Sequence, residues 1–236
     1  ARHCGQSSAA AGAEGQWALM LDQLEQTVDL YGQLCRMAPD RADPARQELG
    51  NLIGKLMADL HATVHSEQQP VPAERGLLCW RGFQLGQTYR RLQLELPEWL
   101  WHLEEQLVRE GAIGLRELAK SDLAGEVTPE QVLRWRHQAI ELMLHLGRLH
   151  NPCPDWIVLA AQELLGVEAE AVLAPESVGQ TDPETIKRLL GWLARLPLPS
   201  EQLSAVQLAA QRGIWSLMLL EQSEASRLKP AAVSVA

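Results

Sequence analysis

Pairs of proline and an acidic residue recur along the chain from residue 97 onward, and they constrain the fold more than any other feature. These pairs are Pro97-Glu98, Pro129-Glu130, Pro154-Asp155 and Pro183-Glu184. Proline suits the first turn of a helix, and an acidic side chain there is favoured by the helix dipole. Thr128 and Gln131 add the spacing of a capping box. The pattern predicts several helices with defined starting points.

Composition agrees with this prediction, because Leu and Ala dominate the apolar residues and β-branched residues are scarce. Leu and Ala are strong helix formers, whereas sheets favour Val, Ile, Thr, Tyr and Phe. We therefore expect an all-α protein, either a multi-helix bundle or a short helical-repeat array, with about seven or eight helices. At most one short strand is expected, near residues 91–96, where apolar and polar residues alternate.

Residues that interrupt helical patterns divide the chain into predicted segments. These are a flexible lead-in at 1–15, a helical hairpin at 16–67, a C-terminal helical domain at 76–229 and a frayed tail at 230–236. The boundary is placed where Gln68–Pro72 interrupts the helical pattern.

Within these segments, some finer expectations concern single residues. In the second helix, which is expected to open at Asp43-Pro44, Leu52 belongs to the predicted buried stripe. Gly50 and Gly54 lie beside that stripe and would let a neighbouring helix approach closely. Gly111 is expected to end a helix that starts at Pro97, with a short helix following near 115–123.

Two stretches of the C-terminal half resemble each other in the order of their elements. Pro97-Glu98-Trp99 matches Pro154-Asp155-Trp156, and each is later followed by a second proline-acidic helix start. This order predicts two related units at 97–150 and 154–198, as in a helical repeat. Convergence on the same helix-start chemistry explains the match equally simply.

Histidines at four-residue spacing are the candidates for metal chemistry. His61 and His65 share one helix face, as do His137, Glu141 and His145. The helical wheel places the second group opposite a core face of Val132, Trp135, Ala139, Ile140, Met143, Leu144 and Leu146. We therefore expect solvated or boundary histidines and no metal or cofactor. The Glu104-Glu105 pair is likewise expected to be surface charge.

The alternating segment 91–96 followed by Pro97-Glu98 resembles the start of a ribbon-helix-helix DNA-binding unit. The resemblance implies strand residues that read base edges, here Arg91, Gln93 and Glu95. The residues Arg90, Arg91, Gln93, Arg134 and Arg136 would then contact nucleic acid. The net charge of −9 opposes bulk binding to nucleic acid.

Tryptophan offers a different function. The chain has 8 Trp residues against 1 Phe and 2 Tyr, spread at roughly one per helix. Trp99 and Trp101 stand two apart on one helix and cannot both face the same core. Because Trp is enriched in interaction hot spots, they are the candidate partner-binding residues.

The leading hypothesis is a non-enzymatic helical protein that works through protein–protein contact, as an adaptor, assembly factor or regulatory subunit. Its partners would be other proteins or further copies of this chain. A nucleic-acid-binding regulator is the alternative, and a helical-bundle metal or cofactor binder is the third. Four dispersed cysteines without a CxxC pair indicate reduced thiols, so we expect a cytoplasmic location. No apolar run reaches the roughly 18 residues of a membrane span.

Overall fold

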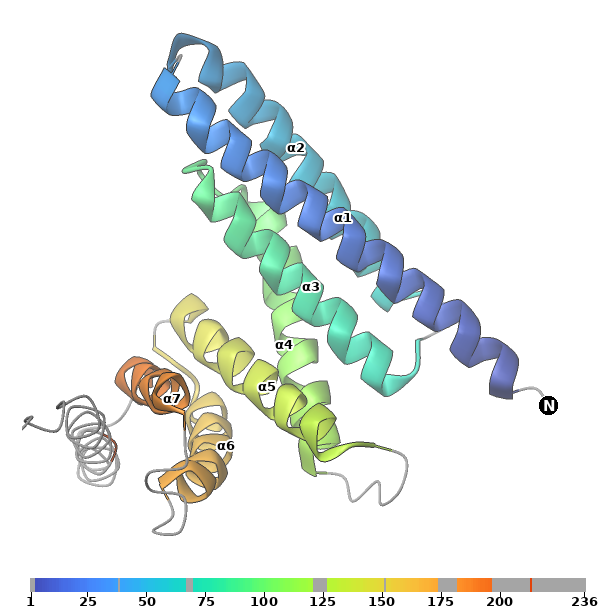
Figure 1. Cartoon of the computed structure of the whole chain (residues 1–236), viewed down its shortest axis with the longest axis vertical. Helices are drawn as coiled ribbons and strands as arrows, with labels where there is room; N and C mark the ends of the chain where they lie inside the picture. The colour runs from blue at the N-terminus through green and yellow to red at the C-terminus, as the bar shows by residue number, and fades with distance from the viewer. Residues whose placement is uncertain are drawn as a thin grey trace, which may run out of the picture. The chain divides into compact units, whose positions relative to one another are not determined.

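The computed structural model describes residues 3–37, 39–66, 70–120, 127–150, 152–173, 182–196 and 213. These residues form seven α-helices and no strand, so the all-α prediction is confirmed (Figure 1). The helices are α1 (His3–Met37), α2 (Pro39–Val64), α3 (Pro72–Arg91), α4 (Glu98–Lys120), α5 (Pro129–Leu149), α6 (Asp155–Leu173) and α7 (Pro183–Arg195).

The chain forms two compact units, residues 1–142 and 143–236, and the division falls within α5. In the first unit α1 and α2 lie side by side as a hairpin, and α3 packs along both (Figure 1). Helices α1, α2, α3 and α4 share one hydrophobic core, and the domain boundary predicted at 68–72 falls between α2 and α3 of this unit.

That shared core explains why these four helices fold together. Each contributes aliphatic side chains that are nearly or completely buried, as the helical spacing of the sequence predicts. The largest include Leu21, Leu24, Val28, Ile53, Met57, Leu60, Leu78, Leu85, Leu100 and Leu107. Burying this many aliphatic side chains supplies the main favourable term in the folding free energy.

Two helix starts differ from those expected. Helix α1 includes residues 3–15, for which the sequence favoured a flexible lead-in; the alanines at 9–11 and 13 favour a helix there. Helix α2 begins at Pro39, so Pro44 lies inside it and Asp43 is not its cap. As the sixth residue of α2, Pro44 lacks the N–H that would donate to the carbonyl group four residues earlier, so one backbone hydrogen bond near the start of the helix is missing.

Helix α3 is an element that the sequence pattern did not delineate, because glycines occupy one of its faces. Larger side chains of α4, which runs antiparallel to α3, pack into the space beside these glycines. A Cβ atom built on Gly76 would lie 2.7 Å from Leu115 Cδ2, and one on Gly82 2.7 Å from Leu107 Cδ1. These missing side chains let the two helices pack closely.

Gly111 does not end α4, contrary to expectation, because it is part of the same contact. A Cβ atom on Gly111 would lie 2.6 Å from Cys79 Cβ of α3 and 2.9 Å from Leu142 Cδ1. The helix therefore continues without interruption from Glu98 to Lys120. A glycine can end a helix, but it can equally allow close packing in the middle of one.

The alternating segment 91–96 connects α3 to α4 and forms no strand. Helix α3 ends as Gln93 takes a left-handed φ of 55°. Leu92 is buried, while Leu94 and Leu96 pack partly buried against the core. The alternation thus reflects an extended connection that turns its leucines inward.

The described helices of the second unit are α6 and α7, which pack against each other. Backbone hydrogen bonds to the carbonyl groups of Pro154 and Asp182 open them, just as those to Pro97 and Thr128 open α4 and α5. The segments 97–150 and 154–198 therefore each contain two helices with similar starts, and their duplication stays a prediction. Among the described helices, none is long and apolar enough to cross a membrane.

Candidate functional site

An apolar groove lies between α1 and α2 in the first unit. It has a volume of about 400 Å³ and is lined by Thr27, Leu30, Tyr31, Leu34, Ala45, Glu48, Leu49 and Leu52. Leu30 is 62% exposed and Leu52 is 46% exposed. Leu52 was expected in the buried stripe of its helix, but it points away from the core that its neighbour Ile53 joins.

The same side of α1 carries two further exposed apolar residues. Leu19, Leu30 and Met37 are separated by 11 and 7 residues, which places all three on one helix face. Solvent-exposed aliphatic side chains gathered in this way are typical of interaction surfaces. The hairpin therefore presents a stripe of exposed apolar residues beside the groove, which we call the outer face of the hairpin.

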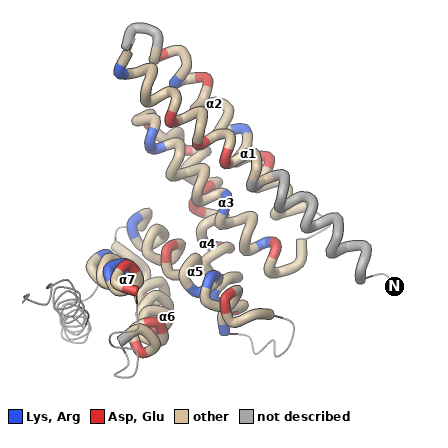
Figure 2. The backbone as a smooth tube through the Cα atoms, in the orientation of Figure 1, with Lys and Arg blue, Asp and Glu red and all other residues tan. Residues whose placement is uncertain are grey.

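Charge is distributed unevenly around α1. Asp22, Glu25 and Asp29 share a helix face that lies opposite the groove residues Thr27, Leu30 and Leu34. The exposed polar residues of α1 that lie nearest the groove are the uncharged Gln23, Gln26 and Thr27. Both acidic and basic positions occur along α2 (Figure 2). Near the groove, the α1 side of the outer face of the hairpin is thus uncharged, while Glu48 of α2 lines the groove itself.

Trp99, a candidate partner-binding residue, stands in the first turn of α4 and is 53% exposed. Its six-membered ring lies against α2, where a Cβ atom on Gly54 would be 3.1 Å from Trp99 Cη2. Gly50 similarly makes room for Leu94. The two glycines of α2 therefore receive side chains from the chain around the start of α4. Trp101 is half-buried, and its ring meets that of His102 edge to face.

A buried ion pair joins α3 to α4. Arg90 donates from Nη1 and Nη2 to the two carboxylate oxygens of Glu104, both at 2.6 Å. Glu104 is completely buried, so the expectation that it is surface charge was wrong. Gly86 provides the space, since a Cβ atom there would clash with Glu104 Oε1. Desolvation makes a single charge costly at this depth, and the bidentate pairing offsets that cost.

This pairing bears on the residues expected to contact nucleic acid. The guanidinium group of Arg90 is engaged by Glu104. Arg91 and Gln93 are exposed in the connection between α3 and α4, and no strand presents them. Arg134 is exposed on α5, while Arg136 is half-buried there. The strand that a ribbon-helix-helix unit requires is absent from the described segment 91–96.

The first pair of histidines belongs to a polar seam between α2 and α4. The rings of His61 and His65 lie 4.1 Å apart, centroid to centroid. His61 Nε2 is 2.7 Å from Gln106 Oε1, and His65 Nε2 is 2.7 Å from Glu110 Oε1. Arg75 of α3 also donates to Glu110, at 2.6 Å from Nη2. This seam links three helices.

The second group, His137, Glu141 and His145, occupies α5. All three side chains are half-buried, and each takes part in a polar or electrostatic interaction. The core face predicted for this helix is confirmed for Trp135, Ala139, Ile140, Met143, Leu144 and Leu146, which are buried. Within the residues that the structure describes, no three His, Cys, Asp or Glu side chains gather as metal ligands would.

The cysteines of the described segments are free thiols: Cys35, Cys79 and Cys153. Burial raises the pKa of Cys79 to about 12, and burial together with Asp155 raises the pKa of Cys153. Both remain protonated at neutral pH, which weakens them as nucleophiles.

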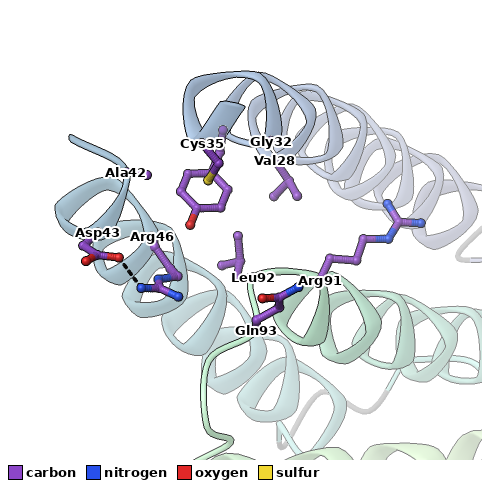
Figure 3. Close-up of a pocket in the computed structure, with 10 residues that line it drawn as sticks. Val28, Gly32, Cys35, Ala42, Asp43, Arg46, Arg91, Leu92 and Gln93 are labelled. Atoms are coloured by element: carbon purple, nitrogen blue, oxygen red, sulfur yellow. Dashed lines mark hydrogen bonds and ion pairs between the residues drawn. The ribbon is translucent and has the colours of Figure 1, made fainter. Parts of the chain in front are cut away.

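A second hollow, of about 370 Å³, lies where α1, α2 and the end of α3 meet (Figure 3). Arg46 pairs with Asp43 at its edge, and Arg91 extends away from it. A hydrogen bond to the Cys35 side chain raises the pKa of Tyr31, another lining residue. No pair of cationic groups converges here, so the hollow lacks the usual features of an anion site.

The second unit has an exposed apolar stripe of its own. Trp156, Leu159 and Val167 of α6 are each more than 40% exposed. Their spacing of three and eight residues puts them on one helix face. Neither this stripe nor the outer face of the hairpin was singled out from the sequence. The outer face of the hairpin could have been predicted from the spacing of Leu19, Leu30 and Met37, which share a helix face outside the buried stripe.

Comparison of the whole chain with protein-family models, with curated proteins and with solved structures found no match.

Proposed function

We propose that the chain is a non-enzymatic helical protein that acts by binding other protein chains, as an adaptor, assembly factor or regulatory subunit. The observation that carries this proposal is the open groove between α1 and α2, with Leu30 and Leu52 exposed along it. An apolar groove between two helices can accept the apolar face of another helix. The cytoplasm is the proposed location, because Cys35, Cys79 and Cys153 are free thiols.

Binding through Trp99 and Trp101 remains a second element of this proposal. Trp99 keeps half of its surface exposed although it also packs on α2. Such a rigid, partly supported aromatic ring suits an interface anchor, because little side-chain entropy is lost when a partner covers it. Binding of nucleic acid is less well supported, since Arg90 is committed to Glu104.

The proposal can be tested by cross-linking the chain in its native cells and identifying what is joined to Lys55, which is exposed on α2. We expect intermolecular cross-links that disappear in a Leu30→Glu/Leu52→Glu variant. A Leu159→Glu variant is the matched control, because Leu159 is equally exposed on α6. A chain without intermolecular cross-links at Lys55 would contradict a binding role for the groove.

A further inference from the structure

The outer face of the hairpin has the dimensions of a stable protein interface. Helix α2 has 26 residues, which at 1.5 Å per residue corresponds to a length of about 40 Å. Two neighbouring helices make a surface about 20 Å wide, so the face offers on the order of 800 Å². A standard protein–protein interface buries about 800 Å² on each partner.

The charges on this face suit a partner with the same surface. An acidic chain repels its own copies wherever acidic residues face each other. The acidic residues Asp22, Glu25 and Asp29 lie away from the groove, and the exposed polar residues of α1 nearest the groove, Gln23, Gln26 and Thr27, carry no charge. Two copies can therefore approach through this face without juxtaposing those carboxylates.

Helix α2 is also complementary to itself when it is reversed. Glu48 and Lys55 are both exposed, seven residues apart, on either side of Leu52. Suppose a twofold axis passes beside Asn51 and Leu52, so that two copies of α2 run antiparallel. Glu48 of each copy then lies opposite Lys55 of the other, and Asp59 lies opposite the uncharged Pro44 and Ala45.

We propose that a second copy of this chain occupies the groove, so that two α1–α2 hairpins pack face to face as a four-helix bundle. In this homodimer Leu30, Leu34 and Leu52 of each copy are buried against the other, and two symmetric Glu48–Lys55 pairs set the register. Four helices packed around an apolar seam are a stable arrangement that an isolated hairpin face does not achieve. The inference rests on the proposed function, since it names the partner of the same groove.

Sedimentation velocity of the purified full chain tests the homodimer. At a chain concentration of about 20 µM we expect a species with twice the mass of one chain, which Leu30→Glu/Leu52→Glu converts to monomer. The variant should keep its helix content, because both leucines are exposed. The Leu159→Glu control should remain dimeric.

Reversing the charges of Glu48 and Lys55 is a second test, and it is specific for a contact with twofold symmetry. Its result does not depend on whether the leucine variant folds. Glu48→Lys alone and Lys55→Glu alone each place two like-charged pairs across the interface and should weaken the dimer about tenfold. The Glu48→Lys/Lys55→Glu double variant should restore it. A monomeric wild-type chain, a leucine variant that stays dimeric, or a double variant weaker than either single one would each overturn the homodimer. If the chain is monomeric but its groove variant loses a cross-linked foreign protein, the inference falls and the proposed function stands.

Discussion

At the scale of single residues, Gly86 decides how closely α3 can approach α4. The carboxylate of Glu104 fills the space beside it and is held there by Arg90, whose Nη1 lies next to the same space. A carboxylate clamped in this way cannot move aside without losing a bidentate ion pair. The glycine, the arginine and the buried glutamate thus act as one packing unit.

This packing can be tested by comparing a substitution of Gly86 with the same substitution of a helical glycine that has open space beside it. Gly86→Ala should lower the free energy of unfolding by about 2 kcal/mol, because its Cβ atom would clash with Glu104 Oε1. Gly32→Ala, where a Cβ atom meets nothing within 4 Å, should instead raise it by about 0.5–1 kcal/mol. Urea unfolding of both variants measures the difference. Equal effects of the two substitutions would mean that Glu104 is not clamped.

Cys79 carries a prediction about pH. Its pKa is raised by burial from 9.0 to about 12, so the folded state holds the proton more tightly than the unfolded state does. The resulting stability is fully present below pH 9 and is lost as the pH rises from 9 toward 12. At pH 8, N-ethylmaleimide should modify Cys79 at least about 100-fold more slowly than half-buried Cys35, because thiolate is the reactive form.

Mass spectrometry of the labelled peptides measures both rates, and adding urea should bring them together. If Cys79 reacts as fast as Cys35 in the folded protein, the pairing of α3 with α4 around Cys79 is looser than described.

At the scale of helices, the sequence predicted elements whose apolar residues recur regularly and missed those that pack through small residues. The stripe of α5 and the capping box at its start were both predictable; Thr128 N donates to Gln131 Oε1 at 2.9 Å. Helix α3 was not delineated, because Gly76, Gly82 and Gly86 mark a contact that only the partner helix reveals. The periodicity of apolar side chains predicts which face of a helix is buried. Glycine has no side chain, so a face that packs through glycines leaves no such pattern in the sequence.

The outer face of the hairpin could not be predicted for a related reason. Leu52 follows the apolar spacing of α2 as well as Ile53 does, and only the placement of α1 and α3 separates the exposed residue from the buried one. A helix with apolar residues on more than half of its circumference has more such surface than one core can bury. Apolar surface beyond what the core of the first unit buries indicates that the helix has a second packing partner.

The turn between α3 and α4 gives a prediction at the same scale. Gln93 follows the last turn of α3 with a φ of 55°, a conformation that is more favourable for glycine than for a residue with a Cβ atom. Gln93→Gly should therefore raise the free energy of unfolding by up to about 1 kcal/mol. Gln33→Gly, inside α1 about one turn before its C-terminal end, should lower it by about 0.5–1 kcal/mol. Thermal unfolding compares the two, and destabilisation by Gln93→Gly would contradict the left-handed turn.

At the scale of the whole molecule, the described helices bury a hydrophobic core and still leave apolar surface exposed. In the first unit that surface includes the outer face of the hairpin together with Val71, Trp99 and Ile113, and in the second unit it lies along α6. A protein whose function is contact with other chains requires surfaces of this kind. We accordingly propose that the groove between α1 and α2 carries the function, whereas the polar seam of His61, His65, Gln106 and Glu110 contributes to stability.

Hydroxyl-radical footprinting of the full chain at two concentrations tests most directly whether the groove is an occupied protein interface. Mass action predicts that oxidation of Leu30, Leu34 and Leu52 is lower at about 50 µM than at about 0.5 µM, while oxidation of Leu159 stays the same. Equal oxidation of the three groove leucines at both concentrations would contradict the assignment of a second copy to this groove.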